Sequence, residues 1–157
     1  MKIKLIWIGR TDGDVFDEAI QQYTKKLRFY TVYEPIAIPY LKSTKALSQD
    51  EQKKREGDLI LKKIDSGDIV VLLDERGKEF TSEKFAQFIQ QQANTGQKAL
   101  VFVIGGAYGF SQKVYDRAEG LVSLSRMTFS HQMVRTIFAE QLYRAFTIIK
   151  GEPYHHE

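Results

Sequence analysis

Three short stretches of this sequence place glycines, charged groups and hydroxyls directly after apolar runs. They are LDERGK at residues 73 to 78, IGGAYG at residues 104 to 109 and LSRMTF at residues 124 to 129. The preceding runs are typical of short buried strands. In parallel sheets, ligands bind beyond the carboxyl ends of the strands. We therefore expect the three stretches to converge on one ligand site.

The glycine cluster in the second stretch admits two interpretations. Glycine accepts positive φ and lets a backbone approach a ligand closely, which suggests a dinucleotide site. However, the spacing is GGxxG instead of GxGxxG, the cluster follows a late strand, and no Walker sequence is present. A tight strand-to-helix turn explains the glycines equally well, so they do not identify a ligand by themselves.

The first stretch contains adjacent carboxylates, Asp74 and Glu75, which could bind a metal ion. No histidine or further carboxylate stands at ligand spacing, so a solvated charged loop is the favoured interpretation and no metal is expected. The chain has no cysteine, which excludes thiolate metal sites, disulfides and cysteine nucleophiles.

A final helix, expected from about residue 131 to residue 150, is apolar around most of its circumference. Such a helix packs against more than its own core, so we expect a second subunit to cover it. Glu140 and Arg144 lie in a narrow polar seam between the apolar faces. They form either an exposed i,i+4 ion pair or part of a shared site, and the sequence favours neither. The apolar set comprises Met133, Val134, Ile137, Phe138, Leu142, Ala145, Ile148 and Ile149.

Apolar strands and helical stretches alternate along the chain. Strands are expected at residues 2 to 8, 34 to 40, 68 to 74, 99 to 106 and 121 to 125. Helices are expected after a cap at Asp14, after a capping box at Ser48 and Glu51, around residues 85 to 89, after Ser111 and at the C-terminus. Strands separated by helices pair in parallel. The predicted fold class is α/β, a parallel sheet with flanking helices.

The composition fits one domain spanning residues 1 to 157. Apolar residues make up 43% and charged residues 27%, and no apolar run approaches the roughly 20 residues that span a bilayer. The N-terminus turns polar too early for a secretory signal, so a cytoplasmic protein with no membrane partner is expected. The net charge is +3, with 13 Lys and Arg against 9 Asp and Glu in residues 1 to 63. This excess permits a nucleic-acid partner without requiring one.

Four ordered motifs, LDERGK, FVIGGAYG, LSRMTFSHQMVR and EQLYRAFTIIKGEPYHHE, resemble the RlmH family of SPOUT-class RNA methyltransferases. The resemblance extends over essentially the whole chain. It implies a SPOUT-type domain with a C-terminal trefoil knot, an exception to the rule against knotted chains. It also implies a homodimer that uses S-adenosyl-L-methionine to methylate N3 of a pseudouridine in 23S (large-subunit) ribosomal RNA, either free or in the assembled ribosome.

The family's cofactor contacts fall on the three stretches identified above. The resemblance implies that the glycines admit the bent cofactor to the backbone and do not cradle a phosphate. The residues implied to bind the cofactor are Leu73, Gly105, Leu124, Ser125, Arg126, Met127, Thr128 and Phe129.

Methyl transfer to an imide nitrogen requires alignment of donor and acceptor and removal of a proton. The resemblance makes His155 the first candidate for the base or positioning group and Glu140 the second, with Arg144 as the third catalytic residue. No metal is needed. Residues expected near RNA are Arg135, Tyr154 and His156, with Arg126 and Arg144 as further cations.

The C-terminal segment is expected to turn back toward the domain. Gly151 can end the final helix in the left-handed conformation, and Pro153 prevents its continuation. Family members often follow Tyr-His with a basic residue, whereas this chain has His156 and then Glu157, so little positive charge is expected there near neutral pH. The alternative functions are a non-catalytic RNA-binding or ribosome-associated dimeric module and a dinucleotide-dependent oxidoreductase.

Overall fold

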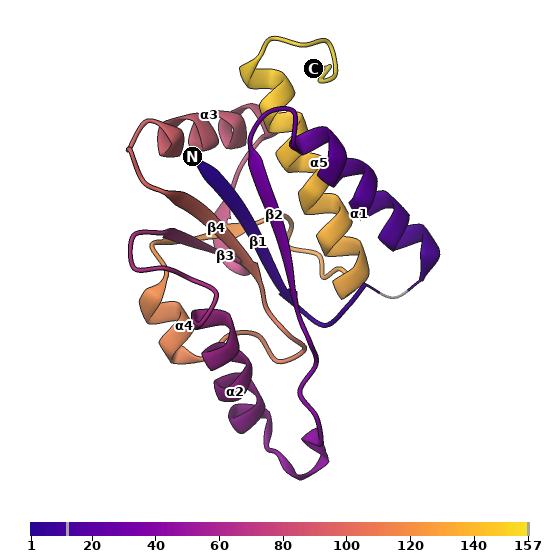
Figure 1. The fold of residues 1–157 in the computed structure, drawn as a ribbon, viewed down its shortest axis with the longest axis vertical. Coiled ribbons are helices and arrows are strands. Elements are labelled where there is room, and N and C mark those ends of the chain that lie inside the picture. Colours follow the sequence, from indigo (N-terminus) through magenta and orange to yellow (C-terminus); the bar gives the residue numbers. More distant parts are fainter. Residues whose placement is uncertain (12, 157) are drawn as a thin grey trace.

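The computed structural model describes residues 1 to 11 and 13 to 156. In this part of the chain, five parallel strands form a sheet in the order β2-β1-β4-β3-β5 (Figure 1). The strands are β1 (Lys2–Ile8), β2 (Val32–Ile38), β3 (Ile69–Glu79), β4 (Ala99–Ile104) and β5 (Gly120–Ser123). The helices are α1 (Asp14–Leu27), η1 (Thr44–Ala46), α2 (Gln49–Leu61), α3 (Ser82–Ala93), α4 (Gln112–Arg117) and α5 (His131–Ile149). The predicted α/β class is confirmed, and the trefoil knot stays a prediction from the resemblance.

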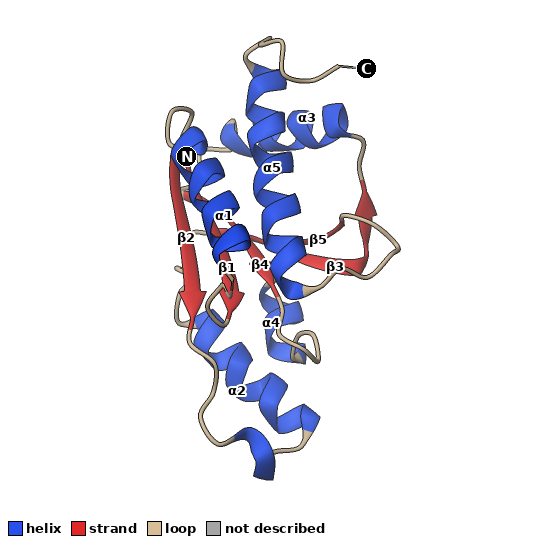
Figure 2. Ribbon diagram, turned by 90° about the vertical axis from the view of Figure 1, so that its right-hand side faces the viewer, coloured by secondary structure: helices blue, strands red, loops and turns tan. Residues whose placement is uncertain are grey.

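Helices cover both faces of the sheet. α1, α3 and α5 pack on one face, and α2 and α4 pack on the other (Figure 2). Every residue of the central strand β4 is buried, as a parallel strand between two helical layers requires. On the first face the rings of Phe102 and Phe138 lie 4.8 Å apart, and on the second Val101 packs in a cluster with Ile60. No helix in the described part of the chain is long and apolar enough to cross a membrane.

Two expected helix starts differ in outcome. The Ser48 cap is confirmed, because its Oγ accepts a hydrogen bond from the Glu51 amide at 3.1 Å. The Asp14 cap is wrong: Gly13 occupies the N-cap with a φ of 87°, and Asp14 is the first helical residue. There its carboxylate still favours the positive end of the helix dipole.

Strand β3 is longer than expected and contains a bulge. Leu73 and Lys78 both pair with Val122 of β5, so residues 74 to 77 form an excursion from the ladder. Gly77 passes so close to β5 that a Cβ there would lie 2.6 Å from the Leu121 carbonyl carbon. Only glycine fits this close approach, and the bulge presents residues 74 to 76 at the edge of the sheet.

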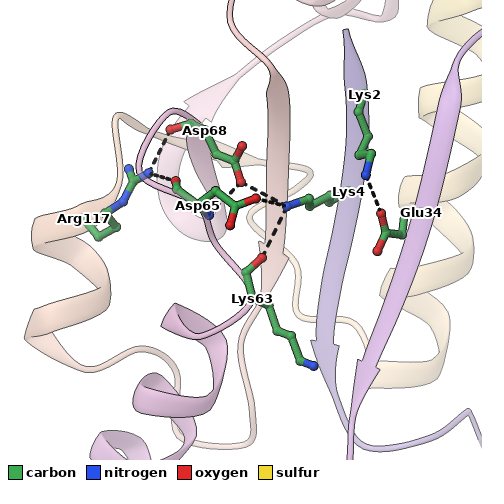
Figure 3. A network of polar contacts seen from close by, with 7 residues as sticks. All are labelled: Lys2, Lys4, Glu34, Lys63, Asp65, Asp68 and Arg117. Carbon is green, nitrogen blue, oxygen red and sulfur yellow. Dashed lines mark hydrogen bonds and ion pairs between the residues drawn. The ribbon is translucent and has the colours of Figure 1, made fainter.

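An ionic network with a buried centre, formed by Lys4 and Asp68, lies toward the amino-terminal ends of β1 and β3 (Figure 3). Lys4 Nζ lies 3.1 Å from the Asp68 carboxylate and 3.4 Å from that of Asp65, and it also donates to the Lys63 carbonyl at 3.5 Å. Arg117 donates to the carbonyls of Asp65 and Asp68 at 3.0 and 2.9 Å. Burial alone would lower the pKa of Lys4, but hydrogen bonds with the two carboxylates outweigh it and raise the pKa. This network holds the turn before β3 at the amino-terminal end of the sheet, whereas the predicted site lies at the carboxyl end.

Candidate active site

A cleft of about 500 Å³ opens at the carboxyl ends of β3, β4 and β5. The three stretches predicted from the sequence line it together, and His131 and Val134 from the first turn of α5 form a further wall. The volume lies within the range of about 300 to 1,000 Å³ typical of small-molecule sites. The expected convergence of the stretches is therefore present in the fold, while binding of a cofactor there stays a prediction.

Most of the residues implied to bind the cofactor line this cleft, but the Arg126 side chain does not. It is exposed and donates from Nε to Glu79 Oε1 at 2.9 Å, on the outer side of the loop. The loop turns at this point because Ser125 Oγ accepts a hydrogen bond from the Met127 amide at 2.9 Å. The lining members of the implied set are Leu73, Gly105, Leu124, Ser125, Met127, Thr128 and Phe129.

The glycine turn lines the cleft, and two of its glycines, Gly105 and Gly106, leave little room for a side chain. A Cβ on Gly105 would lie 3.2 Å from the Phe110 ring, and one on Gly106 would lie 2.6 Å from the carboxylate of Glu56. Gly109 has a φ of 82°, and its amide donates to the Gly106 carbonyl at 3.1 Å. The cluster is thus a tight turn that lines the cleft, which confirms the second of the two sequence interpretations.

A polar group that the sequence did not predict fixes the bulge of β3 at the cleft. The Asp74 carboxylate accepts hydrogen bonds from the Arg76 amide at 2.9 Å, from Arg76 Nε at 3.3 Å and from the Tyr115 hydroxyl. Arg76 Nη2 also donates to the Tyr115 hydroxyl at 2.5 Å. Burial alone would raise the pKa of Asp74, but these hydrogen bonds lower it. The expected solvated loop is wrong for Asp74, because its side chain is only 10% exposed.

A second polar cluster lies at the carboxyl end of α5. Arg144 Nη2 donates to Glu140 Oε1 at 2.5 Å, and Arg144 Nη1 lies 3.2 Å from His155 Nδ1. His155 Nε2 lies 2.7 Å from Glu83 Oε1, and the Tyr154 hydroxyl donates to Glu140 at 3.0 Å. The hydrogen bond with Glu140 raises the pKa of Arg144. Glu140 and Arg144 are therefore not a simple exposed ion pair. They belong to a network with the C-terminal residues after Gly151, which we call the tail. The tail network comprises Glu83, Glu140, Arg144, Tyr154 and His155.

The hydrogen-bond geometry defines the tautomer of His155. An arginine can only donate, so His155 Nδ1 accepts from Arg144, and Nε2 carries the proton and donates to Glu83. Both ring nitrogens are occupied in this arrangement. Between the two roles considered for His155, the geometry therefore favours positioning over proton removal.

The tail is held against α5 as expected. Gly151 has a φ of 68°, its amide donates to the Ile148 carbonyl at 3.0 Å, and the Glu152 amide donates to the Thr147 carbonyl at 2.9 Å. This pair of bonds is a Schellman cap, which reverses the chain direction. The Tyr154 ring then packs edge-on against Tyr143, with centroids 4.8 Å apart. His156 is exposed, and Glu157 lies outside the described residues.

The cleft and the tail network lie at opposite ends of α5. Val134 lines the cleft and Arg144 belongs to the tail network, and ten residues of α-helix separate them by about 15 Å along the axis. The tail network of one chain therefore does not reach the cleft of the same chain.

Arg135 is buried in the protein, so the expectation that it lies near RNA is wrong. It is 1% exposed, and its guanidinium donates to the carbonyl oxygens of Ile8 at 2.8 Å and Arg10 at 3.2 Å. It also lies 5.5 Å from the Trp7 ring centroid. This cation donates to two backbone carbonyls at and just after the carboxyl end of β1, and one of them belongs to the buried residue Ile8.

A larger cleft of about 720 Å³ lies between α3, β3 and β5. Its polar lining consists mainly of glutamines and lysines, and of the three predicted stretches only Lys78 contributes to it. We assign the candidate site to the smaller cleft, because that cleft combines the glycine turn, the ordered bulge and the start of α5.

The fold and the cleft define the class: an α/β protein with a cleft of small-ligand size at the carboxyl edge of a parallel sheet. Comparison with protein families is more specific. Residues 1 to 155 match the family described as "Predicted SPOUT methyltransferase", and the chain belongs to this family.

Curated relatives match over their full lengths. The chain is 56% identical to a protein of Christiangramia forsetii, with 99% of each chain covered. It is 55% identical to a protein of Parabacteroides distasonis and 54% identical to one of Flavobacterium johnsoniae, with both chains covered completely in each case. All three relatives are named "Ribosomal RNA large subunit methyltransferase H".

Proposed function

We propose that this protein transfers a methyl group from S-adenosyl-L-methionine to N3 of a pseudouridine in large-subunit ribosomal RNA. The observation that carries the proposal is the cleft at the carboxyl ends of β3, β4 and β5 in a chain of the SPOUT methyltransferase family. The relatives' names support ribosomal RNA of the large subunit as the substrate. The pseudouridine N3 target follows from the sequence resemblance.

The cleft fits the cofactor in shape. The glycine turn exposes backbone groups at its floor, and Leu73 and Leu124 supply apolar surface beside them. Met127 and Phe129 stand at the mouth, with 77% and 36% of their surface exposed. Apolar walls with a few polar backbone groups suit an adenosine moiety. When bound, S-adenosyl-L-methionine supplies a methyl group attached to a cationic sulfonium.

The cleft also fits the cofactor in charge. Its lining contains the carboxylates of Asp74 and Glu75 and the guanidinium of Arg76. Burial and the positive charge of Arg135 lower the pKa of His131, which favours its neutral form. The described lining thus carries one net negative charge, which complements a ligand whose sulfonium and ammonium outnumber its single carboxylate.

We assign the tail network to the active site of a second subunit in a homodimer. The separation of about 15 Å along α5 keeps the network away from the cleft of its own chain. Two chains related by a twofold axis across α5 would place the tail of each beside the cleft of the other. The outward side of α5 supports this contact, since Met133 remains 41% exposed and Ile137 is only partly buried.

Arg144 is then the group that contacts the substrate base. Loss of the N3 proton to solvent spreads negative charge over the two carbonyl oxygens beside N3. Guanidinium N–H groups of Arg144 that do not bind Glu140 or His155 can donate to these oxygens and stabilise the anion. Glu140, Tyr154 and His155 fix the orientation of the guanidinium. The new N3–carbon bond forms as the carbon–sulfur bond breaks, and sulfur retains the electron pair.

Two measurements test this proposal. Calorimetry with S-adenosyl-L-methionine alone should show binding, whereas a non-catalytic RNA-binding module would bind ribosomes without the cofactor. Mass spectrometry of large-subunit RNA from a strain that lacks the gene should show loss of one methyl group from a pseudouridine, restored by the wild-type gene. Unchanged RNA in the deletion strain contradicts the proposed reaction.

A further inference from the structure

Residues 39 to 55, which we call the basic segment, carry the entire excess of positive charge in the chain. Of the 23 Lys and Arg and 20 Asp and Glu, the segment holds five and two, so the remaining positions hold eighteen of each. A local excess of this kind attracts a polyanion. The five cations are Lys42, Lys45, Lys53, Lys54 and Arg55.

The basic segment projects from the sheet. It leaves the end of β2, forms η1 and enters the first half of α2, beyond the edge at which β1 and β2 end (Figures 1 and 2). None of its residues is buried, and the first buried residue of α2 is Glu56. The segment therefore adds little to the core, and its side chains are available to a partner.

Most of its cations are not neutralised by the protein. Lys54 pairs with Asp50, with Nζ and Oδ2 3.0 Å apart. The other four cations form no ion pair with any of the residues described by the structure. Free lysine and arginine side chains on an exposed segment are the groups that bind nucleic-acid phosphates.

Both ends of the basic segment are fixed at the edge of the sheet that carries the cleft. At one end the Tyr40 ring packs on Gly9 after β1, where a Cβ on Gly9 would lie 2.1 Å from it. At the other end Glu56 packs on Gly106, which lines the cleft. The position of the cations relative to the cleft is therefore set by packing at two points.

We propose that the basic segment binds backbone phosphates of the RNA beside the nucleotide that enters the cleft. This inference rests on the proposed function, because it names the contact that would hold the substrate of that site. An RNA strand with one nucleotide in the cleft must pass this edge of the sheet, and each flanking phosphate carries a negative charge. Exposed aromatic rings lie at the same edge, since Tyr40 and Tyr108 are 56% and 44% exposed, and they offer surfaces on which bases can stack.

The test compares two triple variants that lose the same charge at different places. The segment variant carries Lys42→Gln, Lys45→Gln and Arg55→Gln. The control carries Lys62→Gln, Lys63→Gln and Lys98→Gln, at exposed positions near the opposite edge of the sheet. Lys63 takes part in the buried network through its carbonyl and not its ammonium, so the control leaves that network intact (Figure 3).

Binding is measured by co-sedimentation with ribosomes purified from a strain that lacks the gene, between about 50 and about 200 mM KCl. Each lost phosphate contact lowers the steepness of log K against log salt by about 0.7 to 0.9, so the loss of three contacts should reduce the slope of the segment variant by about two to three units and weaken its binding by about tenfold or more. The control should keep the wild-type slope. All three proteins should bind S-adenosyl-L-methionine equally in calorimetry, which shows that the cleft is intact.

The outcomes separate this inference from the proposed function. If wild type methylates ribosomes and the segment variant matches the control in slope and affinity, the basic segment is not the phosphate contact and the inference fails alone. If wild type binds the cofactor but neither binds nor methylates ribosomes, the proposed function fails and the inference fails with it.

Discussion

Arg144 and His155 face each other at the end of α5, with Nη1 and Nδ1 3.2 Å apart. The contact orders the guanidinium from one side while Glu140 orders it from the other. A guanidinium held at two points loses little conformational entropy when it binds a substrate, which is the basis of preorganised electrostatic stabilisation. The tail thus fixes the orientation of the Arg144 guanidinium and leaves some of its N–H groups free to donate to a substrate.

Replacing Arg144 with lysine keeps the charge but removes this fork. The ammonium cannot hold Glu140 and His155 while donating to two oxygens of a base, so kcat for methylation of ribosomes should fall by about 100-fold or more. KM for S-adenosyl-L-methionine should stay within about twofold, because the cofactor site is not touched. Transfer of radiolabelled methyl groups measures both constants.

The exposed Lys150, six residues further along the chain, provides the matched control. Lys150→Gln should retain wild-type rates because Lys150 takes part in none of the contacts of the network. An Arg144→Lys variant as active as Lys150→Gln would remove Arg144 from the catalytic role.

Replacing Gly105 with valine should weaken cofactor binding more than folding. The new Cβ would lie 3.2 Å from the Phe110 ring and 3.4 Å from the Gly109 carbonyl carbon, so a valine side chain would crowd the turn that lines the cleft. We expect the dissociation constant for S-adenosyl-L-methionine to rise by about tenfold or more, since about 1.4 kcal/mol of lost contact is enough. Gly67→Ala is the control, because nothing lies within 4 Å of a Cβ at that position. Normal affinity in the Gly105→Val variant would show that the cofactor binds elsewhere.

The sequence predicted the cleft better than the contacts inside it. Stretches after apolar runs have a local signal, because strand ends and glycine turns are encoded in neighbouring residues. The bond between Tyr115 and Asp74 joins positions 41 residues apart, and no periodicity of either segment reports it. The prediction that Arg135 lies near RNA was wrong for a related reason. Arg135 binds the carbonyl oxygens of Ile8 and Arg10, and only the fold brings these distant residues next to α5.

Arg135→Met should therefore act on stability and not on RNA binding. It would remove the donor to the carbonyl of the buried residue Ile8 and to that of Arg10, and we expect a loss of about 2 to 4 kcal/mol in the free energy of unfolding. Urea denaturation followed by circular dichroism measures the change. Arg126→Met, at an exposed position, should change stability by no more than about 0.5 kcal/mol. Equal stability of the two variants would contradict the structural role of Arg135.

The proposed homodimer can be tested at the outward face of α5. Burial of apolar side chains stabilises an interface by roughly 1.5 to 3 kcal/mol each, so Met133→Asp with Ile137→Asp should dissociate the dimer or move it toward monomer. Sedimentation equilibrium at micromolar concentration should give twice the mass of 18.1 kDa for wild type and a lower value for the variant. Val32→Asp on β2 changes another exposed apolar residue as a control. A folded wild-type monomer under these conditions would exclude an obligate dimer.

Deleting residues 154 to 157 should abolish the network at the end of α5 while leaving the cleft intact. Methylation should fall by about 100-fold or more, and cofactor affinity should not change.

A site that combines the cleft of one chain with the tail of the other makes a further prediction for mixtures of two variants. In a mixed dimer, the tail-deleted chain supplies a normal cleft and a Gly105→Val chain supplies a normal tail, so one complete site forms in trans. If the chains exchange freely, half of the dimers are mixed and each has one complete site of two, so activity should return to about a quarter of wild type. Were cleft and tail to act within one chain, no mixture of these variants would contain a complete site. Mixing the purified variants after mild denaturation and refolding, with each variant refolded alone as the control, therefore decides between the two arrangements.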